Sequence, residues 1–372
     1  MSTDNPKSYF SLERKASSAY LKLGLFVLLL IFLTVASAFV FPVKRERKNL
    51  ISPGFFQSFN LTSTFNFVFK SEDLSKIVQR NIEGKEGEYA VYIEDLSDGE
   101  SYSLRSLDSF PAASLYKLYL MAAVLKEVDS GQLTVDSLVS AKKSHLVEIY
   151  GGVDFGYEEI AEDGVIEYSV EEALTRVGRI SDNFAAIMLM DKIGRRKVQS
   201  VIDSTSATST NLKSPITTSA SDIGIFLKAL YNGEVVNKAV SEKLIEFLSL
   251  NQLNNRIPAG IRSAFAEASA DKEVGDVGEV RVIHKTGELA GVRHDAGIVY
   301  ISEKLGKTQT ASDSEDQTNR NSDLSGTPSP SELFRTAYII VLMSKDLKYE
   351  DEGVETLAKI SKEVFEYFQK KE

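Results

Sequence analysis

The sequence predicts an α+β fold in which terminal helices cover a single sheet. Strand patterns lie at both ends of the folded part, at residues 88–105 and again from residue 280 onward, whereas residues 114–255 show mostly helical patterns. Strands and helices that are segregated along a chain in this way are typical of α+β folds. Because 43% of the 372 residues are hydrophobic and 26% are charged, the chain also has the composition of a globular protein with a full core.

The charge balance and the rare residue types exclude several classes of function. The net charge is -10 and no long basic run lies outside the N-terminal region, so we expect no nucleic-acid partner. The chain has no cysteine, which excludes disulfides, thiolate metal sites and cysteine catalysis, and its three histidines leave little for a metal centre. We therefore expect neither a metal nor another cofactor.

The N-terminal region has the pattern of a membrane anchor. Residues 23–43 carry no charge and are long enough for one transmembrane helix, so residues 1–22 would be a cytoplasmic segment and residues 44–70 a stalk. The alternative is a cleaved signal peptide, because Ala36-Ser37-Ala38 has the small-x-small pattern of a cleavage site. We favour the anchor because the apolar run continues past Ala38. Basic residues flank this run on both sides and do not set its orientation.

The folded part is predicted to begin with a helix and a β-hairpin. The helix runs from Ser71, which lies in a capping position before two acids, to Gly84. Residues 88–94 and 101–105 then read as two strands joined by a turn at 97–99.

The middle of the chain is predicted to be helical, with clear starts and stops. Ser169 opens a capping box, and Gly194 and Gly233 lie where helices are expected to end. Two polar stretches, 263–278 and 303–332, interrupt the pattern downstream. We interpret them as disordered surface insertions, the second of which lengthens a loop between two strands.

Strand patterns return near the C-terminus, at residues 280–283, 296–301 and 337–343. The last of these is apolar on both faces and is therefore predicted to be a central strand. A closing helix from residue 352 should pack on the sheet, because its apolar residues share one face. These residues are Val354, Leu357, Ile360, Val364 and Phe368.

A serine and a lysine open the most apolar helical segment. Ser-x-x-Lys occurs at Ser114, Ser140 and Ser269, but only at Ser114 do eight consecutive apolar residues follow the lysine. Three residues apart on a helix, Ser114 and Lys117 would share a face. Burial would lower the pKa of the lysine, and a neutral amine can take a proton from a serine hydroxyl. The structural alternative is that Ser114 caps the helix and Lys117 extends to solvent.

Two further motifs argue against a purely structural role for Ser114 and Lys117. Ser181-Asp182-Asn183 lies between helical segments, Lys285-Thr286-Gly287 ends a strand, and each tripeptide occurs once. Taken singly, the first could be a helix cap and the second a strand terminus. The three motifs in this order, in helix, loop and strand contexts, are the signature of class A β-lactamases and penicillin-binding proteins.

From Ser71 to the C-terminus, about four fifths of the chain, the sequence resembles the catalytic domain of class A β-lactamases, a family related to D-alanyl-D-alanine peptidases and transpeptidases. Residues 213–222 resemble the family's Thr-Thr segment before a helix, and residues 292–298 add further similarity after the third motif. The resemblance implies one domain at 71–372, an antiparallel sheet flanked by helices with a helical subdomain.

The resemblance also implies a catalytic role for four residues. Ser114 would be the acylated nucleophile and Lys117 the amine that activates it. Ser181 would relay a proton to the leaving nitrogen, and Lys285 would tune Ser181 electrostatically while binding the substrate carboxylate.

Substrate binding is implied for residues of the second and third motifs and their neighbours. Asn183 would bind the side-chain amide of the substrate, Thr286 its carboxylate, and the backbone N–H groups of Ser114 and Glu288 would form the oxyanion hole. Gly287 belongs to the same strand end, and Arg293 is a further candidate for the carboxylate or else a surface charge. His294 is interpreted as structural.

One part of the family pattern is missing. Class A enzymes release the acyl group with a loop glutamate, but residues 195–215 contain no glutamate and only one acid, Asp203, which we interpret as solvated. Glu148, Glu158 and Glu159 lie in an earlier acidic stretch and would supply a substitute base only if the fold turned one inward. We therefore expect complete acylation machinery with slow deacylation.

Together these patterns predict a membrane-anchored, extracytoplasmic serine hydrolase that forms an acyl-enzyme with a β-lactam or with a D-Ala-D-Ala stem peptide of bacterial peptidoglycan. The localisation alternative is secretion after cleavage near Ala38. The functional alternatives are a penicillin-binding sensor and a non-catalytic module that binds the cell wall.

Overall fold

A five-stranded antiparallel sheet organises the part of the chain that the computed structural model describes, residues 71–270, 279–302 and 336–371. The strand order is β2-β1-β9-β8-β7, so β9 is central, as the apolar pattern of both its faces predicts. Both predicted strand groups are confirmed. The strands are β1 (Glu88–Asp95), β2 (Ser101–Leu104), β7 (Val280–Leu289), β8 (Val292–Ile301) and β9 (Thr336–Lys345).

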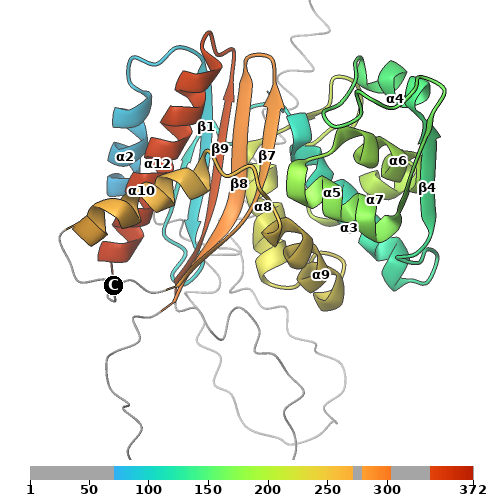
Figure 1. The fold of residues 1–372 in the computed structure, drawn as a ribbon. Coiled ribbons are helices and arrows are strands. Elements are labelled where there is room, and N and C mark those ends of the chain that lie inside the picture. The colour runs from blue at the N-terminus through green and yellow to red at the C-terminus, as the bar shows by residue number, and fades with distance from the viewer. Residues whose placement is uncertain (1–70, 271–278, 303–335, 372) are drawn as a thin grey trace, which may run out of the picture. The chain divides into compact units, whose positions relative to one another are not determined.

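Three helices cover one face of this sheet: α2 (Glu72–Ile82), α10 (Ile257–Ala270) and α12 (Glu350–Lys370) (Figure 1). Ser71 caps α2 by accepting a hydrogen bond from the backbone N–H of Leu74, as predicted. The face predicted for α12 is buried at Leu357, Ile360, Val364 and Phe368, while Val354 is partly exposed at its edge. These apolar side chains form one hydrophobic core with the sheet.

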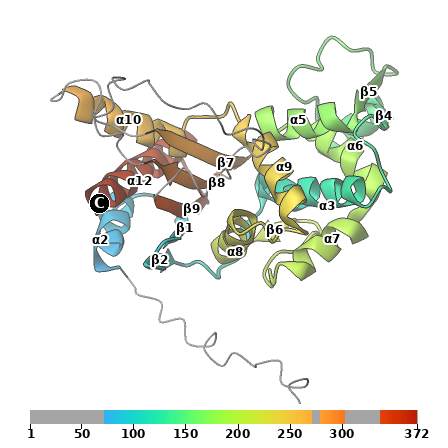
Figure 2. The same ribbon diagram turned by 90° about the horizontal axis from the view of Figure 1, so that it is seen from below.

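The other face of the sheet contacts α8 (Ala220–Tyr231), beyond which lies a helical subdomain (Figures 1 and 2). Ser169 caps α5 and Gly194 ends α6, as predicted, and Gly233 follows the end of α8. A second and larger core fills the space between sheet and helices. The remaining helices are α3 (Lys117–Asp129), α4 (Lys143–Tyr150), α5 (Val170–Ile180), α6 (Asn183–Ile193), α7 (Arg195–Ser204) and α9 (Lys238–Ser249).

The middle of the chain also contains strands that the sequence did not predict. β4 (Leu138–Lys142) pairs with β5 (Val165–Ser169), and β3 (Phe110–Pro111) pairs with β6 (Thr217–Thr218). The expectation that strands return only after the helical middle is therefore wrong. β4 and β5 have several exposed positions, and β3 and β6 have two residues each, so none of them has the apolar run or long alternation that identifies a strand.

Several predictions fall on residues outside the described part. They are the cytoplasmic segment at 1–22, the anchor at 23–43, the stalk at 44–70, residues 271–278 of the first insertion and the whole of the insertion at 303–332. The first half of the insertion predicted at 263–278 is described, and residues 263–270 belong to α10, so the interpretation as a disordered insertion is wrong there. Within the described residues, no helix has both the length and the apolar character needed to cross a membrane.

Candidate active site

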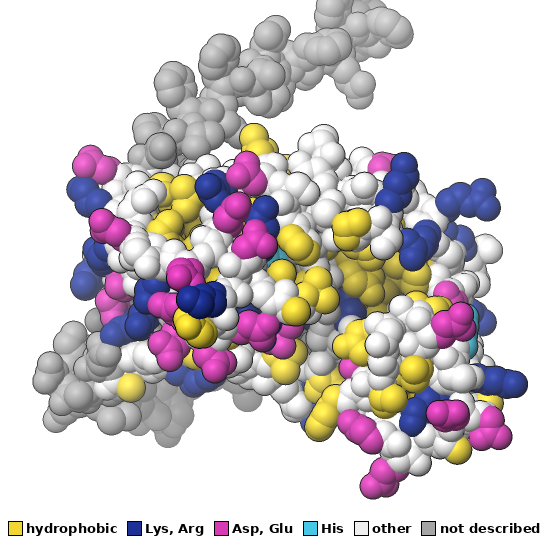
Figure 3. Space-filling model, turned by 90° about the horizontal axis from the view of Figure 1, so that it is seen from above, with side chains coloured by type: hydrophobic (Ala, Val, Ile, Leu, Met, Phe, Trp, Pro, Cys, Tyr) yellow, Lys and Arg dark blue, Asp and Glu magenta, His cyan; other side chains and the backbone are white. Residues whose placement is uncertain are grey.

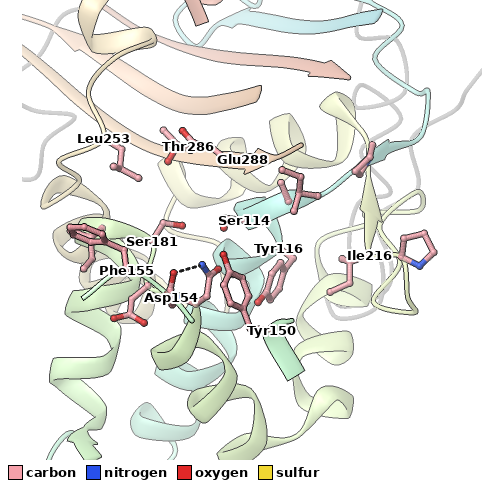
Figure 4. Close-up of a pocket in the computed structure, with 17 residues that line it drawn as sticks. Ser114, Tyr116, Tyr150, Asp154, Phe155, Ser181, Ile216, Leu253, Thr286 and Glu288 are labelled. Carbon is pink, nitrogen blue, oxygen red and sulfur yellow. Dashed lines mark hydrogen bonds between the residues drawn. The ribbon is translucent and has the colours of Figure 1, made fainter. Parts of the chain in front are cut away.

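The three motifs meet in one pocket of about 640 Å³ between the end of β7 and the helical subdomain (Figure 4). Ser114, Ser181, Asn183, Thr286 and Glu288 all line it. More of its lining surface is apolar than polar. Hydrophobic side chains gather around a hollow on the corresponding side of the molecule (Figure 3). The pocket therefore combines a few polar groups with apolar walls, which is typical of sites for small organic ligands.

Ser114 lies in a 3₁₀ turn, Ala113–Tyr116, that continues directly into α3. The preceding residue, Ala113, has a left-handed backbone with φ of 46°, a strained conformation for a residue with a Cβ. No side-chain hydrogen bond caps this turn or α3, so the alternative role of Ser114 as a helix cap is excluded. Its hydroxyl instead faces the pocket.

Lys117 begins α3 and is fully buried, so it does not extend to solvent. Its Nζ lies 2.6 Å from the backbone oxygen of Ser181, 2.7 Å from Oδ1 of Asn183 and 3.4 Å from Oγ of Ser181. Burial lowers the pKa of the Lys117 amine to about 8, although the negative charges of Asp154 and Asp182 oppose this change. A neutral amine is therefore accessible near neutral pH.

Ser181 joins the two lysines of the site. It ends α5 in a left-handed conformation with φ of 59°, and its Oγ accepts a 2.7 Å hydrogen bond from the Nζ of Lys285. Lys285 is fully buried, and its pKa is held well below the usual range, first by burial and second by the positive charge of Lys117. Two buried amines with depressed pKa values thus converge on one hydroxyl at the pocket wall.

The other two residues of the second motif have separate tasks. Asp182 caps α6 by accepting from the N–H of Ala185 at 2.9 Å, and its second oxygen accepts from Tyr157 at 2.6 Å and Arg176 at 2.7 Å. The helix-cap interpretation is therefore correct for Asp182. Asn183, by contrast, directs its side chain to Lys117, so it belongs to the polar network of the pocket.

The third motif lies on β7 and faces the pocket at Thr286. The Oγ1 of Thr286 is buried and has no hydrogen-bond partner among the described residues, so the hydrogen-bonding capacity of this hydroxyl is unmet. Gly287 allows close packing, because a Cβ there would lie 3.2 Å from Cβ of Ala113 and 3.2 Å from Cδ2 of His294. This approach brings the strand end beside the turn that holds Ser114.

Glu288 contributes a carboxylate to the pocket lining, and this carboxylate pairs with Arg256. Arg256 directly precedes α10 and is fully buried, and its Nη2 donates to Glu288. Its Nε and Nη1 have no hydrogen-bond partner among the described residues. Sequence reasoning did not find Arg256, because it lies in no motif.

Arg293 and His294 lie beyond the pocket lining. Arg293 donates to the backbone oxygens of Leu289 and Val292 and pairs with Glu350 at the start of α12. Its guanidinium therefore has partners outside the pocket and does not face Ser114. His294 is buried, and burial lowers its pKa to about 4. Its Nε2 lies 2.8 Å from the backbone oxygen of Pro111, so the neutral imidazole holds the segment that leads to Ser114.

None of the four acids considered as a deacylation base from the sequence lines the pocket. Asp203 is exposed on α7 and bonds to Gln199, while Glu148, Glu158 and Glu159 are also exposed. The segment between α7 and α8 contributes only Pro215 and Ile216 to the lining. The acids that do line the pocket are Asp154, Asp182 and Glu288. Asp154 was missed because it belongs to no motif and meets Asn183 only through a tertiary contact.

A cluster of acids away from the pocket has ligand atoms close enough to hold a cation: Asp95, Asp98 and Glu100. The amine of Lys371 already lies between them, at 2.8, 2.7 and 2.7 Å. This lysine supplies the compensating positive charge, so the cluster is explained by an ion-pair network.

Comparison with known proteins gives a family and a fold. The sequence model of the "Beta-lactamase enzyme family" matches residues 72–321, more than half of the chain. Similar solved structures include PBP-A (TM-score 0.61, 20% identity, covering 82% of this chain and 98% of that one). A second is the acyl-enzyme complex of the L158E mutant of PBP-A with penicillin G (TM-score 0.60, 20% identity, 80% and 96%). A third is a beta-lactamase from Sphaerobacter thermophilus (TM-score 0.58, 19% identity, 79% and 96%). These similarities establish a β-lactamase/transpeptidase-like α+β fold.

Proposed function

The chain belongs to the beta-lactamase enzyme family, and from this premise we propose that this β-lactamase-like serine hydrolase forms a long-lived acyl-enzyme on Ser114. The observation that carries the proposal is the convergence of two buried amines, Lys117 and Lys285, on the hydroxyl of Ser181 in the pocket that Ser114 lines. Burying an amine costs free energy, and groups with such perturbed pKa values cluster at sites where proton transfer is needed.

The proposed chemistry is acyl transfer. The Oγ of Ser114 attacks the amide carbonyl carbon while its proton passes to the neutral amine of Lys117. The C–N bond then breaks, and Ser181 delivers a proton to the leaving nitrogen and regains one from the Lys117 ammonium. The developing oxyanion would be stabilised by the backbone N–H groups of Ser114 and Glu288.

Substrate binding would use the polar groups that the protein leaves available. The unpartnered hydroxyl of Thr286 is suited to a substrate carboxylate, next to the amine of Lys285. The amide nitrogen of Asn183 has two hydrogens, one of which is available for a carbonyl oxygen of the substrate. A β-lactam and a D-Ala-D-Ala stem peptide both present a carboxylate and an amide carbonyl, and the penicillin G acyl-enzyme of the similar PBP-A mutant supports the lactam.

We infer slow deacylation from the part of the pocket lining that the segment after α7 provides. Hydrolysis of an acyl-enzyme needs a base that activates water. The segment after α7, where class A enzymes carry that base, lines the pocket only with Pro215 and Ile216. The three acids that do line the pocket have other partners, since Asp154 accepts from Asn183, Asp182 caps α6 and Glu288 pairs with Arg256. The acyl group on Ser114 is therefore expected to persist.

The location of the enzyme is part of the same proposal. Peptidoglycan and penicillins lie outside the cytoplasmic membrane, so we place residues 44–372 on that side, anchored through residues 23–43. The alternative is release of the folded part after cleavage near Ala38.

The test follows the intact mass of the full-length chain after mixing with benzylpenicillin. We expect a covalent adduct that lasts for many minutes and is absent from Ser114→Ala. Rapid loss of the adduct with accumulation of hydrolysed lactam would contradict slow deacylation. The absence of any adduct, together with no cleavage of a D-Ala-D-Ala peptide, would instead favour a non-catalytic cell-wall-binding module. A lasting adduct without peptide cleavage would favour a penicillin-binding sensor.

A further inference from the structure

Asp154 is an acid of the pocket that no motif includes. It lies in the irregular segment between α4 and β5, is partly buried, and points toward the start of α6 (Figure 4). Its Oδ2 accepts from the backbone N–H of Asn183 at 2.7 Å, and its Oδ1 accepts from the side-chain Nδ2 of the same residue at 3.1 Å. One carboxylate therefore holds both the backbone and the side chain of Asn183.

Two side-chain contacts of Asn183, one with Asp154 and one with Lys117, determine which way its amide points. Its Nδ2 donates to Asp154 while its Oδ1 accepts from the amine of Lys117 at 2.7 Å. A flipped amide would set its oxygen against the carboxylate and its NH2 group against the lysine amine, which loses both hydrogen bonds. We propose that Asp154 is a positioning residue that fixes the amide of Asn183, and through it the amine of Lys117, for acyl transfer at Ser114.

The position of the amine matters because a neutral amine has two N–H donors and one lone pair. In the structure two oxygens close to Nζ accept from Lys117, namely Oδ1 of Asn183 at 2.7 Å and the backbone oxygen of Ser181 at 2.6 Å. When the amine is neutral these two bonds use both donors, so the lone pair is left for a hydroxyl. Loss of the Asn183 contact would free the amine to rotate and would weaken its action as a base.

Asp154 also acts through its charge. The charged groups that face Lys117 are Asp154, Asp182 and Lys285. Asp182 accepts hydrogen bonds from Arg176 and Tyr157 and caps α6, so a substitution of Asp182 would also disturb the fold. Asp154 stabilises the ammonium form of Lys117, and its removal should lower the pKa of that amine further.

The test compares Asp154→Asn, Asp154→Ala and a control, Glu159→Gln, in the full-length chain. Glu159 is exposed in the same irregular segment and does not line the pocket. Two quantities are measured from pH 6 to 10: the second-order rate constant of acylation by benzylpenicillin, and the titration of Lys117 by NMR of ¹³Cε-labelled lysine. Thermal melting of each variant checks that the fold is retained.

For Asp154→Asn we expect the acylation rate at its high-pH plateau to fall by on the order of 10-fold, the value of one charge-assisted hydrogen bond. The acid limb of the profile and the Lys117 titration should both move to lower pH. Asp154→Ala should be at least as slow, and Glu159→Gln should match the wild type. A plateau rate within twofold of the wild type, or a slower rate with an unmoved Lys117 titration, would overturn the inference.

The inference rests on the proposed acylation, but the two fail differently. If the wild-type chain forms no adduct, the proposed function fails while the lysine titration still decides the role of Asp154. A shift of that titration in Asp154→Asn would then support the contact with Lys117, and an unchanged titration would refute it.

Discussion

The amine of Lys285 donates a 2.7 Å hydrogen bond to the hydroxyl of Ser181, which lies 104 residues earlier in the chain. This bond joins β7 to the end of α5, and it holds a fully buried amine against a hydroxyl at the pocket wall. Because burying an amine costs free energy, this contact is better explained by chemistry than by stability.

The first prediction separates these two effects with Lys285→Met, which keeps the length of the side chain and removes the amine. We expect acylation by benzylpenicillin to slow by roughly 100-fold or more, since a proton-transfer group contributes about that factor. The melting temperature should stay at or above that of the wild type. A variant with lost activity and a lower melting temperature would indicate that Lys285 mainly holds the fold.

The second prediction concerns the pH dependence of acylation. The pKa of Lys117 is lowered to about 8 by burial, so the neutral amine that we propose as the base accumulates as the pH rises through about 8. The acylation rate of the wild type should therefore rise from pH 6 and level off above pH 9, with apparent values that belong to the coupled Lys117 and Lys285 pair. Stopped-flow measurement with a chromogenic cephalosporin checks this, and a rate that is flat from pH 6 to 10 would contradict it.

The three sequence motifs predicted those residues of the site whose positions are set by local structure. The spacing of Ser114 and Lys117, the single Ser181-Asp182-Asn183 and the single Lys285-Thr286-Gly287 all lead to the pocket. The apolar pattern of residues 337–343 likewise identified the central strand. In each case hydrophobic burial or a helix terminus imposes a recognisable local pattern.

Asp154 and Arg256 were not predictable in the same way, because their importance comes only from tertiary contacts. Asp154 reaches Asn183 across 29 residues, and Arg256 reaches Glu288 across 32. Arg293 illustrates the converse, since it follows the third motif closely in sequence but its guanidinium pairs with Glu350 of α12. Side-chain direction at such positions depends on neighbours that are distant in sequence.

The third prediction is that His294 makes the folded protein sensitive to acid. Burial lowers its pKa to about 4 from the ordinary value of 6.5, so the unfolded state binds the proton first as the pH falls. The stability that the neutral imidazole contributes is complete above pH 6.5 and is lost as the pH falls toward 4, a loss of roughly 3 kcal/mol.

Urea unfolding at pH 7 and pH 4 measures this effect in the wild type and in His294→Gln, which keeps a donor for Pro111 but does not titrate. We expect the stability difference between the two pH values to shrink by that amount in the variant. His145→Gln is the control, because His145 is half exposed on α4. Equal acid sensitivity of all three proteins would contradict the prediction.

The last prediction addresses what removes the acyl group from Ser114. Ile216 lines the pocket in the segment that follows α7, and no acid of that segment reaches the pocket. A carboxylate placed there by Ile216→Glu would face the acyl-enzyme and could activate water. We expect deacylation to accelerate by on the order of 10-fold or more, below the full effect of an optimised general base. Thr208→Glu adds the same single negative charge to the same segment at an exposed position outside the pocket lining, so it should leave the rate unchanged. The decay of the penicillin adduct, followed by intact mass, gives both rates. Equal acceleration by the two variants would point to a general charge effect and would argue against slow deacylation caused by a missing base at this wall.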